Sequence, residues 1–251
     1  MKIALLSDIH ANRQALEACL AHAHAQGMER LAILGDIVGY GGDPQAVVER
    51  VMELAQQGAI VIQGNHDVMA VSPPIEPQTL GEFGAQWTHD TLSEAHRAFL
   101  AGLPLHARLG HALFVHASAD HPEQWRYVVD GAAAERSMDA AATMDNAIRY
   151  VFCGHVHQQA LYFVTPTAKL MRFTPQPGVA IPVLPHRQWL AIAGSVGQPR
   201  DGDARAMYAM FDDEHARLTF HRVAYDFESA ARAIRAAPLP AFFADRLEAG
   251  L

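Results

Sequence analysis

Residues 3–10 read Ile3-Ala4-Leu5-Leu6-Ser7-Asp8-Ile9-His10, a short apolar run that ends at an acidic residue and a histidine. A short apolar run followed by polar loop residues is typical of a buried strand that stops at a loop. In an open α/β sheet, binding sites lie where such strands end. Asp8 and His10 are therefore candidates for a functional site at a sheet edge.

The same arrangement occurs four more times, each time with acidic, amide or imidazole side chains after an apolar run. The polar segments are Gly35-Asp36, Gly64-Asn65-His66-Asp67, His116 and Gly154-His155-Val156-His157. The apolar runs that precede them are residues 31–34, 60–62, 113–115 and 151–153. These side chains are metal ligands by type, and we expect the strands to bring them to one edge.

The chemistry of the segments suits two metal ions. Asp36 has two carboxylate oxygens and can bridge two ions, whereas a neutral imidazole cannot. Residues two apart in an extended segment point to the same side, so Asp8 and His10 can bind one ion. We expect an extended backbone at His155 and His157 as well. Asn65 offers a neutral oxygen, which limits the negative charge and leaves the ions strongly Lewis-acidic.

The ordered set resembles the calcineurin-like metallophosphoesterase superfamily, whose pattern is D-x-H, G-D, G-N-H-[DE], a lone His and G-H-x-H. All parts are present, and the resemblance covers roughly residues 1–200. The segment 194–200, Gly-Ser-Val-Gly-Gln-Pro-Arg, is similar to a late loop of small bacterial phosphodiesterase-like members. The resemblance defines the reaction type far better than the substrate.

The resemblance implies which residues bind each of two divalent ions and what the ions do. A bridging hydroxide would attack phosphorus in line with the leaving oxygen. Mn²⁺ is favoured, and a shell without thiolate is also compatible with Fe or Zn²⁺. By the family pattern, the first ion is held by Asp8, His10, Asp36 and His157. The second ion is held by Asp36, Asn65, His116 and His155.

The predicted reaction is hydrolysis of phosphodiester or phosphoanhydride bonds in small molecules or nucleotides. One alternative is a phosphomonoesterase, including a protein phosphatase. An alternative of another class is a non-catalytic interaction scaffold on the same fold. A scaffold would be free to lose His10, His66 or His157, and all three are present, which favours an enzyme.

His66 follows a ligand directly and is the candidate for protonating the leaving group or stabilising charge in the transition state. Asp67 is a second catalytic candidate, because its carboxylate can orient the His66 imidazole. The alternative for Asp67 is a helix cap.

Three residues are candidate substrate contacts. Arg200 can bind a phosphate or carboxylate, with a surface ion pair as the alternative. Trp125 and Tyr127 follow His116 in an irregular loop and can border the pocket or cover the core. Gly39, Gly41 and Gly42 surround Tyr40, and we interpret them as permitting a tight turn.

Composition agrees with a globular enzyme: of 251 residues, half are hydrophobic and 18% are charged. The net charge of −8 and the lack of a basic cluster argue against a nucleic acid polymer as partner, which leaves a small phosphoester substrate. No apolar run is long enough to span a membrane. Cys19 and Cys153 do not form a disulfide framework, so we expect a cytoplasmic protein. A homo-oligomer is left open.

The order of elements predicts an α/β (α+β) fold in a single domain, residues 1–251. Together with the resemblance, it implies a four-layer αββα sandwich of two mixed β-sheets flanked by helices. Strands are expected at residues 2–7, 31–34, 60–62, 105–109, 112–116, 149–153, 160–164, 169–173, 189–193, 207–211 and 216–223. Helices are expected at 12–26, 44–57 and 131–146, in an insertion at 66–104 with one or two helices, and in a C-terminal segment at 226–251.

Overall fold

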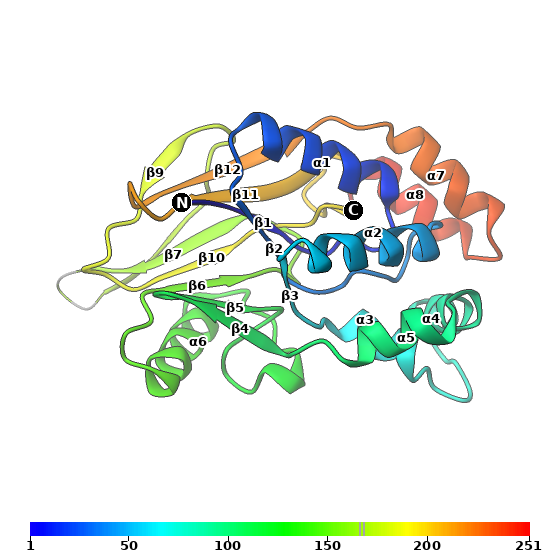
Figure 1. The fold of residues 1–251 in the computed structure, drawn as a ribbon, viewed down its shortest axis with the longest axis horizontal. Helices are drawn as coiled ribbons and strands as arrows, with labels where there is room; N and C mark the ends of the chain where they lie inside the picture. Colours follow the sequence, from blue (N-terminus) through cyan, green and yellow to red (C-terminus); the bar gives the residue numbers. More distant parts are fainter. Residues whose placement is uncertain (166, 168) are drawn as a thin grey trace.

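Two six-stranded sheets pack face to face in the computed structural model, which describes every residue except 166 and 168 (Figure 1). The first sheet has the order β3-β2-β1-β11-β12-β9. In this sheet β1, β2 and β3 run parallel, and the remaining neighbours are antiparallel. Its strands are β1 (Lys2–Leu6), β2 (Arg30–Ile33), β3 (Ile60–Val61), β9 (Ala180–Pro182), β11 (Ala206–Asp212) and β12 (Arg217–Val223).

The second sheet has the order β4-β5-β6-β10-β7-β8. Its central strands β5, β6 and β10 run parallel, and antiparallel strands flank them. Its strands are β4 (His106–Leu109), β5 (Ala112–Val115), β6 (Tyr150–Cys153), β7 (Ala160–Val164), β8 (Leu170–Phe173) and β10 (Trp189–Ile192). Both sheets are therefore mixed, as predicted.

Helices cover the outer face of each sheet and complete the four layers (Figure 1). Helices α1 (Arg13–Ala25) and α2 (Pro44–Gln56) pack on the first sheet, and α6 (Gly131–Met144) packs on the second. In β1, Ala4 and Leu6 face the helices while Ile3 and Leu5 face the other sheet, because side chains alternate along a strand. Burial on both faces explains why this strand reads as a continuous apolar run.

The insertion after β3 contains three helices, where one or two were expected. They are α3 (Asn65–Val71), α4 (Leu80–Thr91) and α5 (Glu94–Ala101). Thr79 and Ser93 each accept a hydrogen bond from a backbone N–H of the helix that follows, at Glu82 and His96. These caps start new helices and divide the insertion more finely than its apolar pattern indicated.

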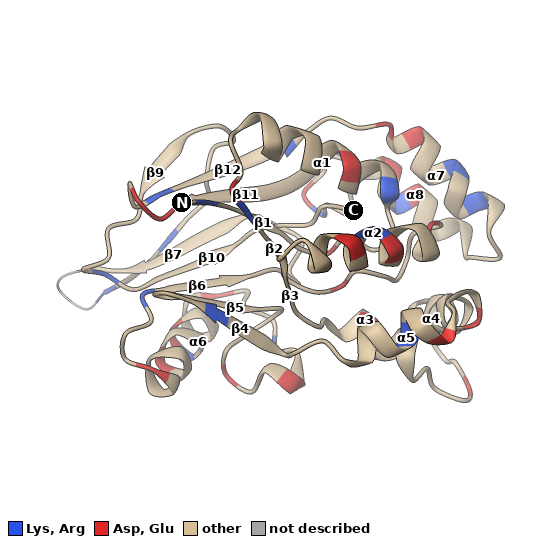
Figure 2. Cartoon of the chain, in the orientation of Figure 1, with Lys and Arg blue, Asp and Glu red and all other residues tan. Residues whose placement is uncertain are grey.

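The C-terminal segment forms two helices, α7 (Phe227–Ala236) and α8 (Ala241–Ala249), which pack on each other at the same end of the molecule as α3 to α5 (Figure 1). The short edge strand β9 was not predicted, because the three residues Ala-Ile-Pro carry too little apolar pattern to indicate a strand. Figure 2 shows an acidic residue near the start of α7 and basic residues after it, and the sequence of this helix contains Glu228, Arg232 and Arg235. No helix among the described residues has the length and apolar character needed to cross a membrane.

Cys19 and Cys153 are both buried and free, which agrees with the prediction of no disulfide. Burial raises the pKa of both thiols, because an apolar interior disfavours the thiolate. Neither thiol is therefore activated as a nucleophile.

Candidate metal centre

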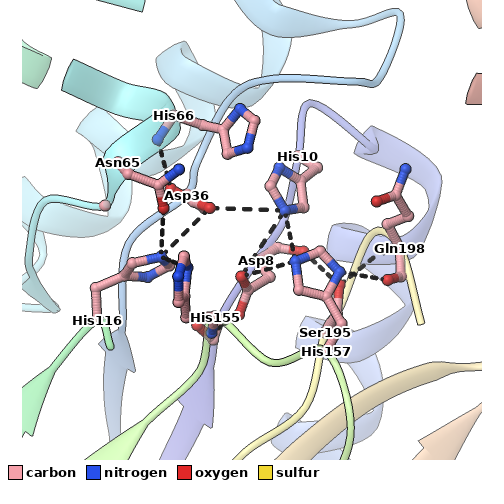
Figure 3. A network of polar contacts seen from close by, with 12 residues as sticks. Asp8, His10, Asp36, Asn65, His66, His116, His155, His157, Ser195 and Gln198 are labelled. Carbon is pink, nitrogen blue, oxygen red and sulfur yellow. Dashed lines mark hydrogen bonds and ion pairs between the residues drawn. The ribbon is translucent and has the colours of Figure 1, made fainter. Parts of the chain in front are cut away.

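The candidate ligands lie in loops that leave β1, β2, β3, β5 and β6 at one edge of the sandwich (Figure 3). Backbone hydrogen bonds hold the first two loops together: Asp8 N–H donates to the Gly35 carbonyl at 3.1 Å, and His10 N–H donates to the Asp36 carbonyl at 2.9 Å. These bonds continue the pairing of the parallel strands into the loops. The position of each side chain therefore depends on the sheet beneath it.

The backbone at the ligands is left-handed rather than extended, which corrects our expectation. The φ angles are 55° at Asp8, 49° at His10, 65° at His155 and 62° at His157. The chain turns sharply as soon as it leaves the sheet, and a left-handed residue produces that turn. Such residues cost free energy and persist only where the surroundings hold them, as functional sites do.

Two glycines of the motifs leave room for a neighbouring loop. A Cβ atom at Gly64 would lie 2.3 Å from the Asp36 backbone nitrogen, and one at Gly154 would lie 1.8 Å from Ser7 Oγ. Both distances are shorter than atoms tolerate, so a larger residue would push the ligand loops apart. The glycines of G-N-H-D and G-H-x-H thus serve close packing between loops.

Asp8, His10 and His157 form the first group of converging donor atoms. His157 Nε2 lies 3.1 Å from His10 Nε2 and 3.1 Å from Asp8 Oδ1. His10 Nε2 lies 3.8 Å from the same carboxylate oxygen. All three side chains are buried, and this group could hold a metal ion.

Asp36, His116, His155 and Asn65 form the second group. His116 Nε2 lies 3.3 Å from Asp36 Oδ2, 3.1 Å from His155 Nδ1 and 3.2 Å from Asn65 Oδ1. Asp36 Oδ2 also lies 3.7 Å from His10 Nε2 in the first group. Figure 3 shows Asp36 between the two groups, so the structure brings all the predicted ligands together around one shared carboxylate.

The imidazoles of His10, His116 and His157 direct their Nε2 atoms at these groups. Each donates its Nδ1 proton to a backbone carbonyl, which can only accept, so Nε2 is the nitrogen that carries the lone pair when the ring is neutral. The carbonyls belong to Val38 at 3.1 Å, Leu34 at 2.7 Å and Gln198 at 2.6 Å, respectively. Two lone pairs that face each other at 3.1 Å repel unless a cation lies between them, so the residues fit metal ions.

Two buried polar atoms support the same conclusion. Asp8 Oδ1 and His155 Nε2 are buried and have no hydrogen-bond partner. A buried oxygen of a carboxylate is costly to leave unpaired. For Asp8 Oδ1, a cation beside His157 Nε2 would supply the missing partner.

The electrostatics of the groups favour cation binding. Burial lowers the pKa of His155 to about 4 and lowers the pKa of His10 well below its usual value. For Asp36, burial opposes ionisation, but the nearby imidazoles, His116 above all, hold its pKa well below the usual value. The imidazoles of His10 and His155 are thus neutral and the carboxylate is ionised, the protonation states that a metal ion requires. Burial lowers the pKa of His116, but the Asp36 carboxylate outweighs burial and raises it to about 9, so an ion bound there would displace a proton from this ring.

His66 lies beside both groups. Its backbone N–H donates to Asp36 Oδ1 at 2.8 Å, and its ring is edge-on to the His10 ring at 5.0 Å (Figure 3). Ring nitrogens of His66 and His10 and an oxygen of Asp36 lie within 4.8 Å of one another. Burial lowers the pKa of His66, so its imidazole is neutral. It is placed to reach a group bound at the donor atoms.

The Asp67 carboxylate binds backbone N–H groups and not the His66 ring. This corrects our suggestion that Asp67 orients the His66 imidazole. Its carboxylate accepts hydrogen bonds from the N–H groups of Ile37 at 2.8 Å, Val38 at 3.2 Å and Gly64 at 2.9 Å. The bond to Gly64 is the capping contact at the start of α3. Asp67 therefore ties the Asp36 loop to the Asn65 loop.

The candidate substrate contacts border the donor groups. Tyr127 is 53% exposed and stacks on the His155 ring at 3.9 Å, and the Trp125 ring lies 5.8 Å from the His116 ring. Arg200 donates its backbone N–H to the His157 carbonyl at 3.2 Å. The surface ion pair considered for Arg200 is not formed, since no salt bridge between described residues includes it.

Tyr40 is a site residue that the sequence did not single out. Its ring lies 4.4 Å from the His66 ring and 4.7 Å from the His10 ring. A Cβ atom at Gly39 would lie 2.7 Å from His66 Nδ1, so this glycine lets the loop approach His66 closely. An aromatic residue flanked by glycines directly after Asp36 was the available signal.

Comparison with known proteins places this site in a family. A profile of the calcineurin-like phosphoesterase superfamily domain matches residues 1–215. An uncharacterized protein of Methanocaldococcus jannaschii is 31% identical over 255 residues, a match that covers 99% of this chain and 98% of that protein.

Two solved structures are similar over the whole chain. A metallophosphoesterase from Sphaerobacter thermophilus is 34% identical, has a TM-score of 0.86 and is matched over 100% of both chains. A hypothetical protein from Pyrococcus horikoshii is 20% identical, with a TM-score of 0.78, over 100% of this chain and 98% of that one. The second likeness shows the shared fold alone.

Proposed function

This chain belongs to the calcineurin-like phosphoesterase superfamily, and from that premise we propose that it hydrolyses phosphodiester or phosphoanhydride bonds of small molecules with two divalent metal ions. The observation that carries the proposal is the position of Asp36 Oδ2, which lies 3.7 Å from His10 Nε2 and 3.3 Å from His116 Nε2. One carboxylate oxygen between two groups of donors suits a ligand shared by two ions.

We propose that Asp8, His10 and His157 complete the first site and that Asn65, His116 and His155 complete the second. Ions held there would polarise a phosphoryl group and lower the pKa of a water molecule. Oxygen and nitrogen ligands without thiolate are compatible with Mn²⁺, which we favour, and with Fe or Zn²⁺.

His66 would act on the leaving group. Its buried ring faces the donor groups, and the Tyr40 ring packs beside it at 4.4 Å. A neutral imidazole at this position can donate a hydrogen bond to the departing oxygen and stabilise the charge that develops on it. Asp67 would contribute indirectly, because its bonds to Ile37, Val38 and Gly64 keep Asp36 and Asn65 in place.

Trp125 and Tyr127 would form one wall of the substrate pocket. Tyr127 covers the His155 ring and Trp125 lies against the His116 ring. Aromatic rings at this distance from the donors suit a compact ester with an aromatic or nucleoside group better than a long polyanion. The net charge of −8 also disfavours polymeric nucleic acid.

A panel of substrates tests the function. Metal-reconstituted protein would be assayed with bis-nitrophenyl phosphate, nitrophenyl phosphate, a nucleoside diphosphate, duplex DNA and a phosphoprotein. We expect the highest kcat/KM for the small diester or the phosphoanhydride. A phosphomonoester or phosphoprotein as the best substrate would favour the monoesterase alternative. Absence of turnover with every metal tested would favour the alternative of a non-catalytic interaction scaffold.

A further inference from the structure

Helix α8 forms part of the surroundings of the metal centre. Phe243 of α8 packs edge-on against Tyr40 at 5.1 Å between ring centroids, and Tyr40 touches the His10 and His66 rings. On the α7 side, a Cβ atom at Gly42 would lie 2.5 Å from the Ala233 backbone. The C-terminal helices are therefore closely packed on the loop that follows Asp36.

Two arginines, Arg200 and Arg246, lie near the contact between Phe243 and Tyr40. The Arg200 guanidinium carbon lies 5.8 Å from the Tyr40 ring centroid, and its Nη2 donates to Gln198 Oε1 at 2.8 Å. Arg246 is on α8, one turn after Phe243, so both side chains lie on one side of the helix. Its Nε donates to the Leu251 backbone oxygen at 2.8 Å.

Neither arginine is paired with a carboxylate side chain among the described residues, whereas their neighbours are. On α7, Arg235 contacts Asp245 at 2.9 Å and Glu248 at 2.7 Å, and Arg232 lies 3.9 Å from Glu228. Arg200 Nε is also buried without a hydrogen-bond partner. A buried charged donor without a partner is costly, which points to a ligand that supplies one.

The Arg246 guanidinium carbon lies 5.6 Å from the Phe242 ring centroid, on the helix whose Phe243 packs against Tyr40, the ring that Arg200 also contacts. Burial and then the charge of Arg200 lower the pKa of Arg246. Neither guanidinium forms an ion pair with an acidic side chain among the described residues, and an anion bound by both would offset the repulsion between them.

We propose that Arg200 and Arg246, with Tyr40 between them and the metal centre, bind a second phosphate of the substrate. Because the Tyr40 ring contacts the Arg200 guanidinium as well as the His66 and His10 rings, the second phosphate would be adjacent to the one at the ions. The substrate class is then a phosphoanhydride, such as a nucleoside diphosphate, rather than a simple diester. This inference rests on the proposed function and selects between its two bond types.

The test compares two metal-binding ligands that differ by one phosphonate. Methylphosphonate and methylenediphosphonate would be titrated calorimetrically into the metal-loaded protein. Loss of one charge-assisted contact should reduce the binding of methylenediphosphonate by about 10- to 100-fold in Arg246→Gln and in Arg200→Gln. The affinity for methylphosphonate should change much less in Arg246→Gln, and Arg246→Lys should recover part of the loss.

Arg232→Gln is the control, since it removes the same charge from an exposed position on α7 and should leave both affinities unchanged. Equal losses for both ligands in Arg246→Gln, or no loss for either, would overturn the proposal.

A measurement without metal separates this proposal from the proposed function. In chelator-treated protein, millimolar methylenediphosphonate should raise the unfolding temperature of the wild type and not of an Arg200→Gln/Arg246→Gln double variant. Absence of catalysis together with this shift would reject the hydrolase and support the arginine subsite. If the protein is catalytically active but no variant changes the affinity for methylenediphosphonate relative to methylphosphonate, the hydrolase is supported and the arginine subsite is rejected.

Discussion

His10 and His157 face each other through their Nε2 atoms at 3.1 Å, although both rings give their Nδ1 proton to a backbone carbonyl. The chain thus holds two lone pairs against each other in a buried site. The backbone supplies the rigidity, since the accepting carbonyls are those of Val38 and Gln198 in neighbouring loops. This arrangement stores repulsion that a cation relieves.

Metal removal is expected to destabilise the protein. Without cations the facing lone pairs and the unpaired Asp8 Oδ1 raise the free energy of the folded state. An ion present at 100 times its dissociation constant adds about 2.7 kcal/mol to the free energy of unfolding. Urea unfolding with and without chelator measures the difference, and elemental analysis should find about two ions per chain. An ion content near one that Asp36→Asn leaves unchanged would contradict a shared carboxylate.

Replacement of His66 by alanine should retain the metal ions and reduce turnover by about 10²- to 10⁴-fold. The loss should be smaller for a nitrophenolate leaving group, which needs little proton donation. His186→Ala, at an exposed histidine, is the matched control. Equal losses for good and poor leaving groups would leave His66 with an electrostatic or structural role, and loss of an ion would make it a ligand.

Asp67→Asn should lower the free energy of unfolding by about 1–3 kcal/mol. An amide keeps one acceptor oxygen but places an NH₂ group against N–H donors that the carboxylate now satisfies. Thermal or urea unfolding measures the change, with Asp139→Asn as a control at an exposed position. If stability is unchanged while turnover falls, Asp67 has a direct catalytic role instead.

Trp125→Ala should reduce kcat/KM for bis-nitrophenyl phosphate by about 2- to 10-fold, the usual worth of one aromatic contact. Phe173→Ala removes an aromatic ring that is 44% exposed on β8 and serves as the control. If Trp125→Ala changes nothing while Tyr127→Ala lowers the rate, the wall is formed by Tyr127 alone.

Acid should destabilise the protein partly through His221, which is remote from the ligands in sequence. Burial, and then the nearby His22, lower the pKa of His221 to about 4. The unfolded chain takes up a proton near pH 6.5, whereas burial keeps His221 of the folded chain neutral until about pH 4. The free energy of unfolding therefore falls as the pH drops from about 6.5 to 4. Above about pH 6.5 this contribution is absent.

In chelator-treated His221→Gln protein, the free energy of unfolding should therefore vary less with pH than in wild-type protein treated in the same way. His215→Gln is the control, because His215 is an exposed histidine paired with Asp212. Identical slopes for His221→Gln and the wild type between pH 6.5 and 4 would contradict the burial argument.

The ligand types, their order and the strands that carry them can be read from the amino-acid sequence alone. These features are local: an apolar run followed by Asp, Asn or His is visible within ten residues, as at Asp8 and Asp36. The family pattern added the assignment of residues to ions. The two-sheet architecture followed from the same runs, because strands buried on both faces need layers on both sides.

The conformation of the ligand loops and the identity of their neighbours depend on the tertiary packing. The left-handed backbone at His155 and His157 depends on the loops packed against it. The same packing places the Asp67 carboxylate against backbone N–H groups rather than against the His66 ring. Tyr40 meets Phe243 from a helix 200 residues away in the chain, and no local pattern encodes such a contact. Side-chain distances between remote segments arise from packing, which sequence periodicity does not specify.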